Sequence, residues 1–94
     1  MIVEWSPQAS EDRDRIFDYI ATDNPVAAIE LDDKIGELTS ALPQHPELYR
    51  PGRVRGTREA VVTENYVIIY CVKREHVEIL RVLHARQQWP GSKT

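Results

Sequence analysis

The alternation of apolar and polar residues is clearest between Tyr66 and His84, where two apolar runs flank a short polar segment. The run Tyr66–Val72 is rich in aromatic and β-branched residues, and both of its alternating faces are apolar. The run 77–84 has a similar composition, and the residues between the two runs are polar. This pattern predicts a β-hairpin whose first strand is covered, at least in part, on both faces.

The second run contains one residue that does not fit an apolar strand, Arg81. Strict alternation places Arg81 on the face of Val77, Ile79 and Leu83, and places His84 on the opposite face. A buried arginine is costly unless it meets a carboxylate, a phosphate or water. Arg81 is therefore either a functional residue or the partner of an acid on a neighbouring strand, such as Glu59.

Two helices are expected in the first half of the chain. Ser6 and Pro7 are typical of a helix start, and this helix runs to about Thr22. Its apolar stripe contains Ala9, Ile16, Phe17 and Ile20, whereas much of the remaining surface carries Glu11, Asp12, Asp14 and Asp18.

The second helix begins with the same device, Asn24 as the cap and Pro25 as the first helical residue. Apolar residues recur at spacings of three and four until Pro43 ends the helix; they are Ala28, Leu31, Ile35, Leu38 and Leu42. Because the connection between the helices is short, we expect them to fold back as an antiparallel hairpin.

The remaining segments complete an α+β fold. A short strand is expected at residues 2–5, an irregular loop at 43–57, and a further strand at 57–63 that a tight turn joins to the hairpin. The prediction is an N-terminal strand and an antiparallel helical hairpin packed on one face of a small sheet, which contains a C-terminal three-stranded antiparallel meander. The opposite face has less chain to cover it and is the natural place for a site.

Composition fits one globular domain over residues 1–94, with 41% hydrophobic and 29% charged residues. The chain shows no apolar run long enough for a membrane span and no recognisable signal peptide, so a cytoplasmic protein without a membrane partner is expected. The single cysteine, Cys71, lies in a predicted core strand and is expected to be a buried thiol. Three scattered histidines and one cysteine predict no metal site, and we expect no cofactor.

The net charge of −3 hides an uneven distribution. Residues 1–49 contain three basic and eleven acidic residues, whereas residues 50–94 contain nine basic and four acidic residues. This asymmetry indicates either two surfaces for two different partners or two solvated faces without partners.

Three segments together resemble the RelE/ParE superfamily of toxins from bacterial type II toxin–antitoxin modules: residues 56–62, 65–70 and 77–86. The most specific string is Arg81-Val82-Leu83-His84-x-Arg86. The resemblance implies a small cytoplasmic toxin that inhibits growth, acts in plasmid stabilisation, and is neutralised by a cognate antitoxin protein.

One branch of the superfamily consists of RelE-like messenger RNA interferases, which cut RNA on the ribosome without a metal. In that reading Arg58 and Arg81 stabilise the charge of the phosphorane, and His84 acts as acid or base. The chain lacks the tyrosine or second histidine and the many lysines that these nucleases usually carry. Enzymatic activity is expected only if the chain belongs to this branch. Alternatively, His84 has a structural role, as a hydrogen-bonded residue that fixes the end of the strand.

The other branch consists of ParE-like inhibitors of DNA gyrase, which have no nuclease activity. The ending Leu83-His84-x-Arg86 resembles this branch more closely, so the prediction leans toward it. The expected target-binding residues lie in the basic loop and the tail: Arg50, Arg53, Arg55, Arg86 and Trp89. A third reading is a degenerate module that only binds its antitoxin.

Overall fold

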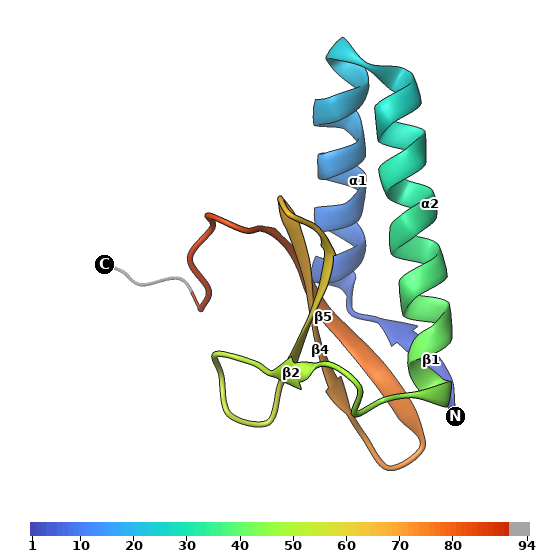
Figure 1. The fold of residues 1–94 in the computed structure, drawn as a ribbon, viewed down its shortest axis with the longest axis vertical. Helices are drawn as coiled ribbons and strands as arrows, with labels where there is room; N and C mark the ends of the chain where they lie inside the picture. The colour runs from blue at the N-terminus through green and yellow to red at the C-terminus, as the bar shows by residue number, and fades with distance from the viewer. Residues whose placement is uncertain (91–94) are drawn as a thin grey trace.

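The computed structural model describes residues 1–90, so residues 91–94 of the expected domain lie outside the described part. The elements follow in the order β1 (Ile2–Trp5), α1 (Pro7–Asp23), α2 (Pro25–Ala41), the 3₁₀ turn η1 (Leu42–Gln44), β2 (Arg50–Pro51), β3 (Arg58–Thr63), β4 (Tyr66–Val72) and β5 (His76–His84) (Figure 1). The predicted order of helices and strands is confirmed, except that the sequence did not predict the short strand β2. The loop expected to be irregular contains η1 and β2. Neither described helix has both the length and the apolar composition of a membrane span.

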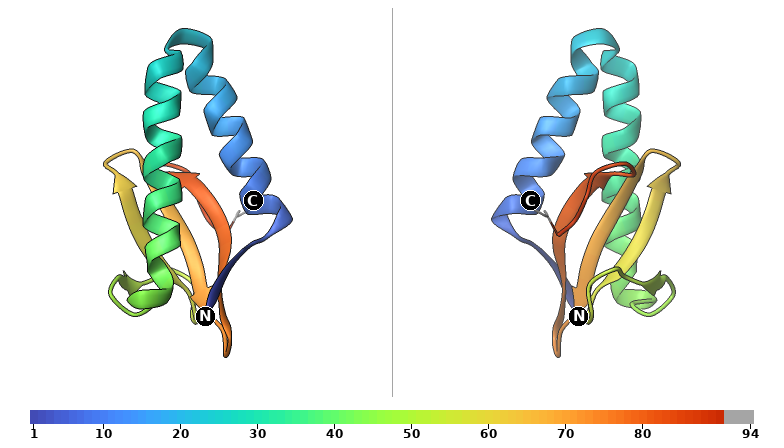
Figure 2. Two further views of the ribbon diagram at one scale, coloured as in Figure 1. Left: turned by 90° about the vertical axis from the view of Figure 1, so that its right-hand side faces the viewer. Right: turned by 90° about the vertical axis from the view of Figure 1, so that its left-hand side faces the viewer.

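The five strands form one sheet in the order β1-β5-β4-β3-β2. The strands β2 to β5 pair antiparallel, and β1 lies parallel to β5. Figure 2 shows the helical hairpin over one face of the sheet, with the opposite face left free of helices. The α+β architecture expected from the sequence is therefore confirmed, and the N-terminal strand extends the meander on the side of β5.

The core consists of two clusters, one on each face of the sheet. The larger cluster packs under the helices and includes Leu31, Ile35, Ile68, Tyr70, Ile79 and Val82. The smaller cluster lies on the other face and contains Val67, Ile69 and Leu83, with Leu80 and Trp89 packed against it. The strand β4 is thus covered on both faces, as its composition predicts. Cys71 is a buried free thiol, and burial raises its pKa.

A β-bulge in β5 changes which side chains share a face. Tyr70 pairs with Ile79, and Ile69 pairs with Arg81, so Leu80 is an extra residue in β5. The predicted alternation, which put Leu83 on the face of Ile79, is wrong beyond this point. Leu83 belongs to the small cluster, and Ile79 belongs to the large one.

Both helices begin at the residues that the sequence indicates. The Ser6 hydroxyl accepts a hydrogen bond from the Ala9 amide at 3.0 Å, and the Asn24 side chain accepts one from the Ala27 amide at 3.1 Å. Ser6 has a second role, because its hydroxyl donates to the carbonyl of Leu80 at 3.0 Å. The cap of α1 is therefore also a contact with the bulge of β5.

These two caps allow a direct comparison. We expect Ser6→Ala to lower the free energy of unfolding by about 1–2 kcal/mol, at the upper end for an N-cap, because it also removes the bond to Leu80. Asn24→Ala removes a cap alone, so its effect should be smaller. Urea unfolding followed by circular dichroism measures both. Equal losses would show that the contact with Leu80 contributes nothing.

Candidate functional site

The edge of β5 is satisfied by three successive partners from the N-terminal part of the chain. The strand β1 pairs with β5 only as far as Trp5 and Ile79. Ser6, the residue after β1, is the second partner: its amide donates a hydrogen bond to the Ile79 carbonyl at 2.9 Å. The next partner is Asp12 of α1, whose carboxylate accepts the amide of Val82 at 3.0 Å. A side chain thus continues the hydrogen bonding of the edge after the strand has ended.

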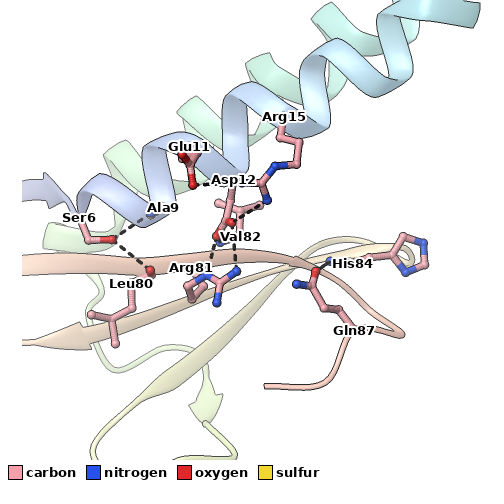
Figure 3. Close-up of polar contacts among 10 residues, drawn as sticks. All are labelled: Ser6, Ala9, Glu11, Asp12, Arg15, Leu80, Arg81, Val82, His84 and Gln87. Carbon is pink, nitrogen blue, oxygen red and sulfur yellow. Dashed lines mark hydrogen bonds and ion pairs between the residues drawn. The ribbon is translucent and has the colours of Figure 1, made fainter. Parts of the chain in front are cut away.

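The same carboxylate binds Arg81 in a fork (Figure 3). Arg81 donates from Nε to Oδ2 of Asp12 at 2.7 Å and from Nη2 to Oδ1 at 3.1 Å. The Asp12 side chain is 3% exposed and the Arg81 side chain 15%. Hydrogen bonding to Asp12 raises the pKa of Arg81. The pair is well shielded from water, and both carboxylate oxygens of Asp12 accept a hydrogen bond from the Arg81 guanidinium.

Further charges surround this pair on the solvent side. Arg15 lies 3.7 Å from the Asp12 carboxylate and donates to Glu11 at 3.0 Å. Arg15 is mostly exposed, so its ion pairs contribute little to stability.

The position of Asp12 corrects two sequence-based expectations. Asp12 was expected among the polar residues that cover the outside of α1, but it is buried. Arg81 was expected, as its structural alternative, to pair with an acid such as Glu59, and it pairs with Asp12. Spacing does carry a signal for this position, because Asp12 lies three residues after Ala9 and four before Ile16, on the apolar stripe.

Arg58 lies in β3, opposite Tyr70 of β4. Its Nη1 donates to the carbonyl of Tyr49 at 2.7 Å and to that of Glu47 at 3.4 Å. The side chain borders an open hollow of about 320 Å³ together with Glu47, Pro51, Gly56, Thr57 and Val72. Arg58 therefore holds the loop that precedes β2 against the sheet.

His84 ends β5, opposite Tyr66, and the two rings meet edge to face at 5.3 Å between centroids. Its Nδ1 accepts a hydrogen bond from the amide of Arg86 at 3.1 Å, so the neutral ring carries its proton on Nε2. The imidazole borders a largely apolar hollow of about 330 Å³ with Arg15, Ile16, Tyr19, Tyr66 and Gln87.

The structure does not bring Arg58, Arg81 and His84 into one site. Cross-strand partners share a face of the sheet, and successive residues of a strand alternate. Arg58 is opposite Tyr70 and Arg81 is opposite Ile69, so their side chains leave the sheet on opposite sides. None of the three shares a hydrogen-bond partner or a hollow with another.

A second buried carboxylate, Glu59, lies on the helix-free face. It accepts hydrogen bonds from Arg53 Nε at 2.8 Å, from the Arg53 amide at 2.9 Å, and from Arg50 at 3.3 Å. The Glu59 side chain is 5% exposed, and the hydrogen bond from the Arg53 side chain is the largest cause that lowers its pKa to about 2. Glu59 thus fixes the positions of two arginines that the sequence places in the target-binding set.

The other predicted target-binding residues lie in the same loop and in the tail after β5. Arg53 Nη1 reaches the carbonyl of Gln87 at 3.4 Å, which links the basic loop to the tail after β5. Trp89 in that tail packs against the small cluster. The side chains of Arg55 and Arg86 make no hydrogen bond or ion pair with any residue in the described part of the chain. The structure therefore gathers the loop arginines and the tail on one side of the sheet.

The chemistry available at these positions differs from that of an acid–base site. The described residues contain no group of three histidines, cysteines, aspartates or glutamates placed to hold a metal. The two most buried carboxylates are both occupied by arginines. What the helix-free face offers is the guanidinium groups of Arg50 and Arg53 on Glu59, and a tail that carries Trp89 and is linked to Arg53.

Comparison with known proteins defines the class. The fold and the sequence place the chain in the RelE/ParE superfamily of toxins. A family model described as "ParE toxin of type II toxin-antitoxin system, parDE" matches residues 3–89, and the chain belongs to this family. The resemblance noted from the sequence is thereby confirmed.

Two relatives and a solved structure are also similar to the chain. The chain is 43% identical over 89 residues to "Putative toxin Y4kP" of Sinorhizobium fredii, covering 94% of this chain and 92% of the relative. It is 35% identical over 83 residues to Toxin RelE2 of Caulobacter vibrioides, covering 88% and 93%. A solved structure described as the chromosomal ParDE TA system from P. aeruginosa aligns with a TM-score of 0.81 at 26% identity, covering 89% of this chain and 95% of that one.

Removing the carboxylate at the β5 edge should be costly. We expect Asp12→Ala to lower the free energy of unfolding by about 3 kcal/mol or more, because it leaves the Arg81 charge and the Val82 amide without their partner. Asp14→Ala on the exposed side of the same helix is the control and should change stability by about 0.5 kcal/mol or less. Urea titration of both variants measures the difference. Similar small losses would contradict the central role of Asp12.

The depressed pKa of Glu59 gives a pH dependence with a definite sign. The ionised Glu59 contributes stability that is fully present above its ordinary pKa near 4.5 and is lost as the pH falls toward about 2. We expect the wild type to lose more unfolding free energy between pH 5 and pH 3 than Glu59→Gln, as measured by urea unfolding at each pH. Glu64→Gln in the exposed turn should follow the wild type. Parallel pH profiles for wild type and Glu59→Gln would refute this assignment.

Proposed function

We propose that the chain is a ParE-like inhibitor of DNA gyrase, neutralised by a cognate antitoxin. The observation that carries the proposal is the fork between Arg81 and Asp12. The match to the ParE toxin family supports the same branch of the superfamily.

The arginines of the chain are not directed at a common phosphate position, as RNA cleavage would require. A metal-free nuclease needs positive charge directed at the developing phosphorane and an acid or base within reach of the same phosphate. Arg81 directs its charge at Asp12, and Arg58 directs two bonds from Nη1 at backbone carbonyls. His84 lies near Tyr66 and borders a different hollow. A toxin that acts by binding requires no such convergence.

An antitoxin partner follows from the same family membership. The family description names a type II toxin–antitoxin system, and the P. aeruginosa structure is described as a ParDE system. In this proposal the antitoxin keeps the toxin inactive in the cytoplasm, and the loss of the antitoxin releases it. The strongly acidic and strongly basic halves of the sequence provide distinct surfaces for antitoxin and target.

Induction of the chain in bacteria, with and without the neighbouring gene, tests the proposal. We expect growth inhibition, SOS induction and gyrase-dependent DNA breaks, all suppressed by co-expression of the antitoxin. The informative variant is His84→Gln, which should remain toxic to within about twofold. A catalytic acid or base would instead lose about 10²–10⁴ in rate.

Other outcomes identify the alternatives. Arrested translation with cut messenger RNA, abolished by His84→Gln or Arg81→Ala, would make the chain a RelE-like interferase, an activity that the name of the Caulobacter relative also suggests. Toxicity that survives in both variants would leave these side chains with structural roles. No growth defect at all would leave an antitoxin-binding module.

A further inference from the structure

We call five residues of two neighbouring segments the arginine–tryptophan face: Arg50, Arg53, Arg55, Arg86 and Trp89. Contacts with Glu59 and with the small cluster place Arg50, Arg53 and Trp89 on the helix-free side of the sheet. They come from the loop around β2 and from the tail after β5. Figure 1 shows both segments on the side of the sheet away from α1 and α2. None of these residues belongs to the large core under the helices.

Part of this face is held rigid by a buried acid. Glu59 fixes Arg53 through its side chain and its backbone amide, and fixes Arg50 through one guanidinium nitrogen. Arg50 is nevertheless 61% exposed, so much of its guanidinium faces solvent. Arg53 also joins the loop to the tail through the Gln87 carbonyl. A partner therefore meets arginines whose conformational entropy is already reduced.

Charge on this face is not balanced within the chain. Glu59 neutralises one of the two arginines that it binds. Arg55 and Arg86 are exposed, and their side chains have no acidic partner among residues 1–90. The face therefore carries an excess of positive charge, although the whole protein has a net charge of −3. A ligand with several negative charges is the complementary partner.

The face also has an apolar component. Trp89 is half-buried against the cluster of Val67, Ile69 and Leu83. Val61 pairs with Val67, so it lies on the same side of the sheet, and it is 51% exposed. Arginine and tryptophan beside exposed apolar surface are the residues enriched at the centres of protein–protein interfaces.

We infer that the arginine–tryptophan face binds an acidic segment of the toxin's protein target, with carboxylates on the arginines and an apolar side chain beside Trp89. This inference rests on the proposed function, in which that target is DNA gyrase. A protein segment fits better than a nucleic acid, since a long polyanion would also be repelled by the acidic hairpin. The exposed acids of that hairpin include Glu11, Asp14, Asp18, Glu30, Asp33 and Glu37.

The test reverses the two unpartnered charges one at a time. We expect Arg55→Glu and Arg86→Glu each to raise the toxin concentration that half-inhibits gyrase supercoiling by about tenfold or more, and to relieve growth inhibition. Lys34→Glu on the exposed side of α2 makes the same change in net charge and should leave both readouts near wild type. Urea unfolding and antitoxin binding, measured for all three variants, show whether the fold and the second partner are retained.

The outcomes separate this inference from the proposed function. Full gyrase inhibition and full toxicity in both arginine variants would overturn the inference, as would loss of antitoxin binding with target inhibition intact. If the two arginine variants lose binding to free DNA but inhibit gyrase as the wild type does, the face binds nucleic acid, and the inference is likewise overturned. If the wild type stops growth without affecting gyrase, the proposed function fails. The arginine–tryptophan face is then tested by growth inhibition alone. If Arg55→Glu and Arg86→Glu both relieve growth inhibition and Lys34→Glu does not, the face binds a protein target other than gyrase.

Discussion

The structure depends on how the unpaired edge of β5 is satisfied after β1 ends. A strand edge with unpaired amides inside a helix–sheet interface would cost free energy at every group. Asp12 meets this requirement by binding the Val82 amide, and it meets a second one by neutralising Arg81. Because one carboxylate satisfies both groups, α1 is fixed over the end of the sheet at a defined register.

The arginines of the chain differ in whether their guanidinium groups are already bound to other groups of the protein. Arg81 and Arg53 are bound to buried carboxylates, and Arg58 is bound to backbone carbonyls. Arg55 and Arg86 remain free in the described structure. A toxin surface built from free cations around fixed ones suits recognition of a partner. The distinction between bound and free arginines is therefore the basis of the functional proposal.

Much of the fold was predictable from local signals. The cap residues Ser6 and Asn24, each followed by proline, mark the helix starts, and the apolar run of β4 predicts coverage on both faces. The superfamily was recognisable from the string that ends at Arg86, and the family comparison confirms it. The bulge at Leu80 was not predictable, because an extra residue in one strand is visible only against the partner strand.

The sequence by itself determined the order of the elements, the positions of the caps, the two apolar clusters in outline and the asymmetry of charge. These features depend on residues close together in the chain. The tertiary structure alone decided which acid meets which arginine: Asp12 and Arg81 are 69 residues apart. Ion pairing depends on distance in space. The alternation of apolar and polar residues along the sequence does not predict a β-bulge, nor a helix that crosses the edge of a strand.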